Sequence, residues 1–224
     1  MYPFTDRTDA GRKLSSLFTK ETKPLSDMII CAIPNGGVPI AISLAESLNI
    51  NRVYVYLARK IQFPWTTEAG FGAVTIDGDT IYNQIFIQTG YINQNAIEKQ
   101  TEKALQELKK RAEVFEKHLL PANLKNKEIF LIDDGLASGI TMKTAIMSIV
   151  KRNPNRITVA VPTAHARTVQ HFEQLANESS DINLRIICLD IRAGKSFAVA
   201  DAYKYWKDEN SEEVLQLLDT YNNN

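Results

Sequence analysis

The stretch IFLIDDGLASGIT, residues 129–141, decides the fold that the sequence predicts. Four apolar residues run directly into Asp133 and Asp134, and a loop with two glycines follows before an amphipathic segment begins. This order predicts a buried strand, then a loop, then a helix. In an open parallel sheet, ligands bind beyond the carboxyl ends of the strands, so we expect the two acids at a binding edge.

Apolar runs and amphipathic segments alternate on both sides of this stretch. We expect strands over 28–34, 52–60, 129–133, 156–162 and 184–191, and helices over 6–18, 40–48, 95–118, 142–152, 166–176 and 212–218. Residues 73–76 and 80–82 predict two shorter strands joined by a turn at Asp77 and Gly78. The alternation predicts an α/β fold, with a central parallel sheet flanked by helices. The length favours a single domain over residues 1–224.

The composition excludes several function classes. Acids and bases balance at 26 each, so no global charge favours nucleic acid or an anionic membrane as a partner. Cys31 and Cys188 lie in apolar runs and are expected to be buried thiols, and three scattered histidines form no zinc motif. The start of the chain is too polar for a signal peptide, and no apolar run is long enough to span a bilayer. We therefore expect a cytoplasmic protein.

The loop after the acid pair predicts an anion site. Glycines between a strand and a helix let successive backbone N–H groups point inward, and the helix N-terminus adds to them. The acids would repel a phosphate, so they should contact another part of the same ligand, either sugar hydroxyls or a bridging Mg²⁺. An ordinary strand end with a glycine turn is the alternative. The candidate phosphate-binding residues are Gly135, Leu136, Ala137, Ser138, Gly139, Ile140 and Thr141.

This motif resembles the phosphoribosyl-pyrophosphate (PRPP) signature of the type I phosphoribosyltransferases. The segments DRTDAGRKL, AIPNGGVPIA, LARKIQFPWTTEAGFGAV and FAVADAYKYW also resemble, in the same order, a bacterial and archaeal group of that family whose acceptor is generally unassigned. The resemblance implies that Asp133 and Asp134 hold the ribose hydroxyls and that the loop after them holds the 5′-phosphate. Magnesium bound near the acid pair, through the ligand or water, is also implied.

The resemblance also requires a second anion pocket, for the pyrophosphate. Asn35, Gly36 and Gly37 follow an expected strand and are the candidates, although the same residues would suit a helix-capping turn. Similar loops in the family often carry a cis peptide, and arginine often stands where Asn35 stands here. Arg59 and Lys60 end the second expected strand, where they are either pyrophosphate ligands or a solvated strand end.

Two peripheral segments complete the predicted site. Residues 61–72, which include Trp65, Glu68 and Phe71, are expected to form a flexible lid that excludes water. Residues 192–207 correspond to the family's hood over the acceptor. Phe197, Val199, Tyr203 and Tyr205 could line it, or could be the core of a small subdomain. Near the start of the chain, a phosphate contact by Arg7 is a further hypothesis.

The resemblance implies an enzyme that moves the phosphoribosyl group of PRPP to a nitrogen of a small planar acceptor, with Mg²⁺, and releases pyrophosphate. Two alternatives use the same pocket: a regulator that senses PRPP, and a phosphosugar hydrolase. Related proteins are commonly homodimers. The long helix expected over 95–118 could pack on a partner subunit or could cover the sheet.

Overall fold

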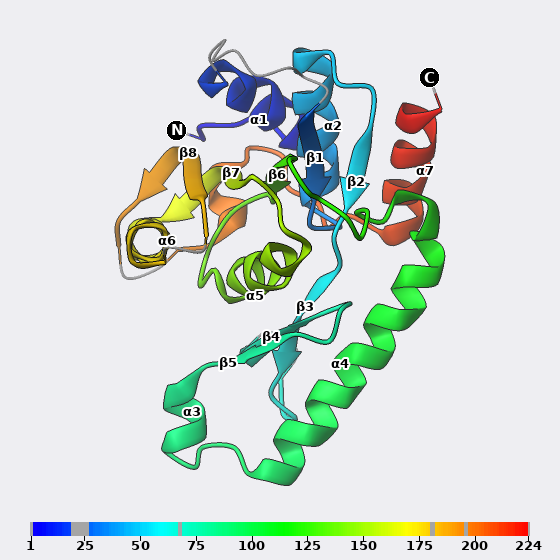
Figure 1. Ribbon diagram of the computed structural model, residues 1–224. Coiled ribbons are helices and arrows are strands. Elements are labelled where there is room, and N and C mark those ends of the chain that lie inside the picture. The colour runs from blue at the N-terminus through cyan, green and yellow to red at the C-terminus, as the bar shows by residue number, and fades with distance from the viewer. Residues whose placement is uncertain (1, 19–26, 67–68, 180–181, 195–196, 224) are drawn as a thin grey trace.

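The computed structural model describes residues 2–18, 27–66, 69–179, 182–194 and 197–223 (Figure 1). Its centre is a five-stranded parallel sheet in the order β2-β1-β6-β7-β8. These strands are β1 (Met28–Ala32), β2 (Val53–Val55), β6 (Glu128–Ile132), β7 (Arg156–His165) and β8 (Leu184–Arg192). The prediction of an α/β fold with a central parallel sheet is confirmed.

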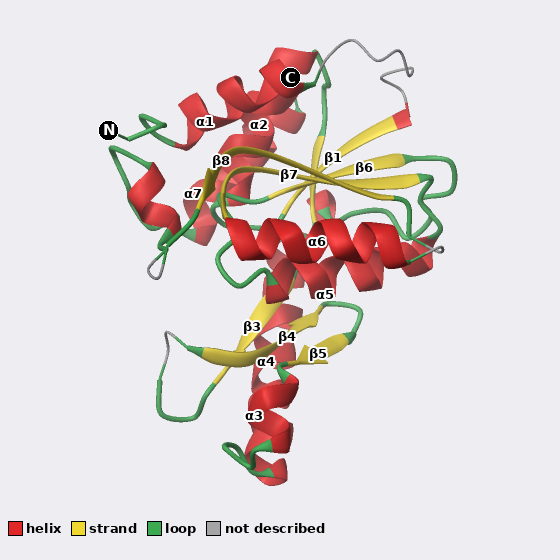
Figure 2. Ribbon diagram, turned by 90° about the vertical axis from the view of Figure 1, so that its left-hand side faces the viewer, coloured by secondary structure: helices red, strands yellow, loops and turns green. Residues whose placement is uncertain are grey.

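Helices cover both faces of this sheet (Figure 2). One layer contains α1 (Arg7–Leu14), α2 (Gly37–Leu48) and α7 (Ser211–Asn222), and the opposite layer contains α5 (Ile140–Ile149) and α6 (Ala166–Glu178). Successive side chains of a strand alternate between faces, so Phe130 and Ile132 enter one core and Ile129 and Leu131 the other. Coverage on both sides explains why this strand reads as a continuous apolar run.

The chain leaves the large sheet after β2, which the sequence did not predict. Residues 52–60 form β2 and then β3 (Ala58–Gln62), which belongs to a second, three-stranded sheet. There β3 pairs antiparallel with β4 (Gly70–Thr75), and β4 pairs with β5 (Thr80–Tyr82). Tyr56 and Leu57 between β2 and β3 are both buried, so no polar turn residue marks the break. The prediction of one strand ending at Lys60 is therefore wrong.

The long helix α4 (Gln94–Val114) packs on this second sheet (Figure 1). Its buried Ala104 and Leu108 belong to the apolar stripe that the sequence indicated. It contacts β3 and β4, so the idea that it covers the large sheet is not supported. A short helix before it, α3 (Gln84–Gln88), was not predicted. In the described part of the chain, no helix combines the length and apolarity needed to cross a bilayer.

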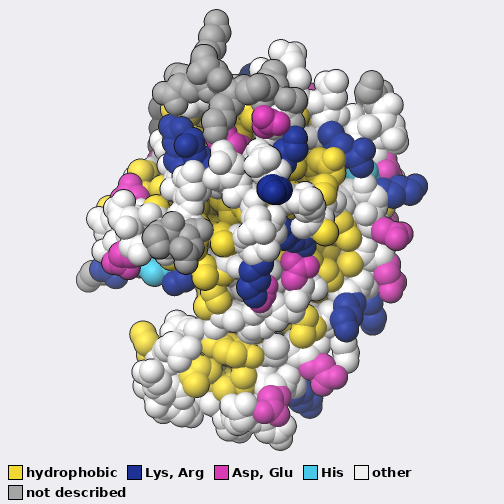
Figure 3. Space-filling model, in the orientation of Figure 1, with side chains coloured by type: hydrophobic (Ala, Val, Ile, Leu, Met, Phe, Trp, Pro, Cys, Tyr) yellow, Lys and Arg dark blue, Asp and Glu magenta, His cyan; other side chains and the backbone are white. Residues whose placement is uncertain are grey.

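The segment expected as a lid is strand at both ends, since β3 includes Ile61 and β4 begins at Gly70. Phe71 is fully buried, and Phe63 stacks on Trp65 with ring centroids 5.1 Å apart. Figure 3 shows apolar side chains gathered on this part of the molecule. The ends of the segment are thus not irregular loop. Glu68 lies outside the described residues, and closure over the site stays a prediction.

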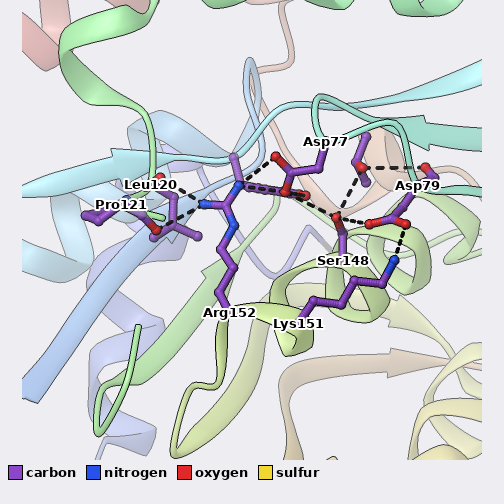
Figure 4. Close-up of polar contacts among 9 residues, drawn as sticks. Asp77, Asp79, Leu120, Pro121, Ser148, Lys151 and Arg152 are labelled. Carbon is purple, nitrogen blue, oxygen red and sulfur yellow. Dashed lines mark hydrogen bonds and ion pairs between the residues drawn. The ribbon is translucent and has the colours of Figure 1, made fainter. Parts of the chain in front are cut away.

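Ion pairs and a hydrogen bond connect the β4–β5 turn to the end of α5 and to the 3₁₀ helix η4 (Val150–Arg152) that follows it (Figure 4). Arg152 Nη2 donates to both carboxylate oxygens of Asp77, at 2.9 and 2.6 Å. Ser148 Oγ donates to Asp79 Oδ2 at 2.6 Å, and Lys151 forms an ion pair with Asp79. The turn predicted at Asp77 is confirmed, and these contacts fix the small sheet relative to the large one.

Candidate active site

The loops that follow β1 and β6 meet at one cavity, because these two strands are neighbours in the sheet. The cavity has a volume of about 370 Å³. Its lining residues are Ile33, Pro34, Asn35, Gly36, Ala58, Arg59, Lys60, Gln62, Asp133, Asp134 and Thr141. The structure thus brings together the acid pair, the loop after β1, the two cations and one residue of the expected phosphate site.

Asp133 and Asp134 stand at the carboxyl end of β6. The Asp134 N–H donates to Asp133 Oδ1 at 2.8 Å. Burial raises the pKa of Asp133 well above its usual range, and the neighbouring charge of Asp134 raises it further. Burial also raises the pKa of Asp134, while the charge of Arg7 opposes that shift. A cation or hydroxyl donors entering the cavity would stabilise the ionised form of both acids.

Arg7 holds Asp134 in place. Its side chain is buried, and Nε and Nη2 donate to Asp134 Oδ2 at 3.1 and 2.8 Å. Its Nη1 donates to the Lys207 carbonyl at 2.8 Å and to Glu209 Oε1 at 3.2 Å. The guanidinium carbon lies 4.0 Å from the ring centroid of Trp206. Every guanidinium nitrogen has a protein partner, so Arg7 positions Asp134 and the hypothesis of a phosphate contact is not supported.

Residues 133–139 link β6 to α5, and the last two residues of the predicted phosphate site, Ile140 and Thr141, begin the helix. The Leu136 N–H donates to the Thr163 carbonyl at 3.0 Å, so this amide is already used within the fold. Gly139 has a φ of +71°, which favours glycine, and it is the N-cap of α5. Thr141 is the second residue of α5, where it lines the cavity. The other amides of this loop and the N-terminus of α5 remain the predicted phosphate site.

Both polar atoms of the Asn35 side chain form hydrogen bonds within the protein. Its Nδ2 donates to the Glu209 carbonyl at 2.8 Å, and its Oδ1 accepts from Arg111 Nη2 at 2.5 Å. The Pro34–Asn35 peptide is cis, as the resemblance implied. Asn35 therefore joins the loop after β1 to α4 and to the segment that precedes α7.

Two glycines follow Asn35 and make close backbone approaches. A β-carbon on Gly36 would lie 1.9 Å from Asp134 Oδ2, and one on Gly37 would lie 2.6 Å from the Ile132 carbonyl oxygen. The Gly37 N–H already donates to the Ile33 carbonyl at 3.2 Å. Of the two predicted pyrophosphate amides, Gly36 is therefore the better candidate.

Arg59 and Lys60 reach the cavity from β3 of the small sheet. The sequence predicted that they end a strand of the parallel sheet, which is wrong. Both nevertheless line the same cavity as the acid pair. The Arg59 guanidinium forms an ion pair with Glu107 of α4, with Nη2 and Oε2 2.5 Å apart. Part of its charge is thus already compensated within the protein.

The expected hood residues lie in different environments. Val199 packs on the phosphate loop, since a β-carbon on Gly135 would be 2.7 Å from its Cγ1. Phe197 is half-buried and lies edge-on to His165, with ring centroids 5.9 Å apart. The ring of Tyr203 is buried, and its hydroxyl donates to the Asp134 carbonyl at 2.6 Å. Tyr203 thus supports the acid pair and offers no stacking surface, whereas Phe197 and Val199 remain hood candidates.

Sequence reasoning assigned no role to Glu107, Arg111 and Glu209, although all three contact predicted site residues. Glu107 and Arg111 are four positions apart on a charged helix, a spacing that usually indicates a solvated pair. Glu107 and Arg111 point toward the site only because of how α4 packs against β3 and the loop after β1. No local signal could have identified them.

The phosphoribosyl transferase domain family model matches residues 7–187 of the chain. Two Mycobacterium tuberculosis proteins, from strains CDC 1551 and H37Rv, are 30% identical to it over 216 residues. Each carries a provisional name as a phosphoribosyl transferase. The match covers 96% of this chain and 46% of each relative, so the chain spans about half the length of these curated relatives.

Solved structures show the same architecture. The protein TT1426 from Thermus thermophilus superposes with a TM-score of 0.73 at 26% identity, covering 97% of this chain and 98% of that one. AQ2163 from Aquifex aeolicus, at 12% identity and a TM-score of 0.53, covers 84% of this chain and 75% of that one and shares the fold. Fold and cavity define an α/β protein with an acid pair at the carboxyl edge of its sheet. The chain belongs to the phosphoribosyltransferase family.

Proposed function

We propose that this chain transfers the 5-phosphoribosyl group of PRPP to a nitrogen of a small planar acceptor and releases pyrophosphate. Family membership supports transfer of this kind. The observation that carries the proposal is the convergence of two strand ends on one cavity. Gly36 of the β1 loop lies so close to Asp134 of the β6 loop that no side chain fits between them. One ligand can therefore contact both loops.

The proposed roles follow from charge. Asp133 and Asp134 accept hydrogen bonds from the ribose hydroxyls, and the loop after them binds the 5′-phosphate. Gly36, Arg59 and Lys60 bind the pyrophosphate. The bond from C1 to the pyrophosphate oxygen breaks, its electron pair leaves with pyrophosphate, and the acceptor nitrogen bonds to C1 and loses a proton. Positive charge that develops on the sugar is stabilised by the nearby carboxylates.

The residues present fit a magnesium ion that is shared with the substrate. Among the described residues, no group of three or more His, Cys, Asp or Glu could hold a metal by itself. Mg²⁺ usually binds through one or two carboxylates together with substrate phosphates and water. Asp133 and Asp134, whose pKa values burial raises, could supply such carboxylates through the ligand or water. When bound, the ion would neutralise charge on the leaving pyrophosphate.

The test is incubation of the chain with PRPP, Mg²⁺ and a panel of nucleobases, followed by mass detection of nucleotide products. We expect one or a few bases to yield a nucleotide with stoichiometric pyrophosphate. Rapid release of pyrophosphate from PRPP without any base would instead indicate the hydrolase. Tight PRPP binding with no turnover across the panel would indicate the sensor.

Gly36→Ala is expected to weaken PRPP binding about 10–100-fold. The new methyl group would overlap Asp134 Oδ2, which lies 1.9 Å from the β-carbon position, and would displace the carboxylate from Arg7. Calorimetric titration with PRPP and Mg²⁺ measures the effect. Gly78→Ala is the control, because Gly78 has a φ of +87° but open space around it. That variant should lose some stability and keep its affinity, and equal affinities for both variants would contradict the proposed site.

A further inference from the structure

Arg111 is a cation held in the protein without a matching negative charge. Its Nη2 donates to Asn35 Oδ1, and its Nε is buried without a hydrogen-bond partner in the described part of the chain. Burial lowers the pKa of Arg111, and the charge of Arg59 lowers it further. The nearby Glu107 is paired with Arg59. Within the described residues, Arg111 therefore has a neutral amide where a carboxylate would be expected.

The two arginines give this side of the cavity an excess of positive charge. Arg59 and Asn35 both line the cavity. Arg111 is not among the lining residues and donates a hydrogen bond to Asn35. Glu107 forms an ion pair with Arg59, and Arg111 has no ion pair within the described residues. An incompletely compensated buried charge is costly, and an anion that entered the cavity would offset this cost.

Arg59 and Asn35, with Arg111 hydrogen-bonded to Asn35, form one wall of the cavity, and the chemistry of this wall favours a diphosphate over a single phosphate. The loop after β6 already offers backbone amides and the N-terminus of α5 for a monophosphate. The arginines belong to other elements, β3 and α4, and adjoin the separate loop after β1. A guanidinium is more weakly hydrated than an ammonium, and its planar set of donors matches phosphate oxygens, so arginine suits a multiply charged diphosphate.

We infer that Arg111 supplies the second positive charge of a diphosphate-binding wall and that Asn35 fixes its guanidinium there. The inference rests on the proposed function, because the diphosphate is that of PRPP or of the released pyrophosphate. Arg59 contacts the diphosphate. Arg111 does not contact the diphosphate. It orients the Asn35 side chain through their hydrogen bond, and its positive charge attracts the diphosphate from behind Asn35. In this chain, α4 thus contributes to the site from outside the parallel sheet.

Arg111→Met is the first test, with Mg²⁺ and either inorganic pyrophosphate or ribose 5-phosphate as the titrant. We expect the dissociation constant for pyrophosphate to rise about 10–30-fold. Ribose 5-phosphate carries no diphosphate, so its affinity should stay within about twofold of wild type. Arg111→Lys should recover part of the pyrophosphate affinity, and added salt should narrow the difference between variants. Lys110→Met is the matched control, since Lys110 is the exposed neighbour on α4.

Glu107→Gln gives a second test that does not remove an arginine. Without this carboxylate, Arg59 also lacks a counter-charge, as Arg111 already does, so pyrophosphate affinity should increase about 3–10-fold. Unchanged pyrophosphate affinity in Arg111→Met, or equal loss for both ligands, would overturn the inference. Weaker pyrophosphate binding in Glu107→Gln would also overturn it.

These binding results are separable from the proposed function. Wild type that binds ribose 5-phosphate and pyrophosphate, with the variant pattern above, supports the diphosphate wall even if no base yields a nucleotide. In that case only the transferase proposal fails. Wild type that binds neither ligand would overturn the inference together with the proposed site.

Discussion

Replacing Asp133 with asparagine is expected to lower the rate of the proposed phosphoribosyl transfer about 10²–10³-fold while making the unliganded protein more stable. The rate falls because the variant loses the carboxylate that we propose stabilises the developing sugar cation. Stability rises because a buried charge is removed, and asparagine keeps the Oδ1 that accepts from the Asp134 N–H. Because burial raises the pKa of Asp133, ionising this carboxyl disfavours the folded state, and a neutral asparagine should raise the free energy of unfolding at neutral pH.

The pH dependence gives the sign of this effect. The pKa of Asp133 is raised in the folded chain by burial and by Asp134, so the folded state retains its proton longer than the unfolded state. Wild-type stability therefore falls as pH rises above the unfolded aspartate pKa, about 3.9, and stops falling once folded Asp133 ionises. The advantage of Asp133→Asn should grow through the same window. Chemical denaturation at a series of pH values measures it.

Glu173→Gln is the control for Asp133→Asn, because Glu173 is an exposed carboxylate on α6. It should change neither stability nor rate appreciably. An Asp133→Asn variant that unfolds more easily than wild type at neutral pH would contradict the burial argument. A variant that retains its full rate would contradict the proposed role of the carboxylate.

Arg7→Met is expected to destabilise the protein by about 3–5 kcal/mol, the usual cost of leaving a buried charge without its partner. Asp134 would lose both hydrogen bonds from Arg7, and Glu209 would lose one. The pKa of Asp134, already raised by burial, would rise further without the opposing charge of Arg7. The stability deficit should therefore be larger at pH 7.5 than near pH 5, because the unfolded state ionises first as pH rises.

Urea denaturation of Arg7→Met and Arg12→Met at both pH values checks this prediction. Arg12 is exposed on the same helix, so its replacement removes the same charge without breaking a buried contact. The double variant Arg7→Met with Asp134→Asn should recover part of the loss, since it also removes the unpaired acid. Equal stability of the Arg7 and Arg12 variants would show that the Arg7–Asp134 pair contributes little.

The large sheet and the acid pair could be predicted because their signals are local. Apolar runs such as residues 129–132 read as strands covered on both faces, and Asp133 and Asp134 follow at once. Ligands bind at the carboxyl edge of a parallel sheet, so the sequence could predict that Asp133 and Asp134 lie at a binding site. Gly139 was also predictable, because a positive φ there is a property of the loop itself.

Two strands of the small sheet were predicted near residues 73–76 and 80–82, where β4 and β5 lie. The separate strand β3 and the contacts of the arginines could not be predicted, because they depend on distant parts of the chain. The break between β2 and β3 falls at Tyr56 and Leu57, whose burial hides it in an apolar run. Arg7 contacts Asp134 from 127 positions away, and Arg111 contacts Asn35 from 76 positions away. Only tertiary packing decides such pairs, and one sequence carries no trace of them.

The position of the supporting residues after β8 has a consequence for biosynthesis. Tyr203 holds the Asp134 carbonyl, and Glu209 holds both Arg7 and Asn35. A ribosome makes the last strand of the large sheet before it reaches either residue, since β8 ends at Arg192. A nascent chain that pauses there has all five strands of the parallel sheet but lacks Tyr203 and Glu209, which support the pocket. The pocket is therefore completed only after the parallel sheet that carries it has been synthesised.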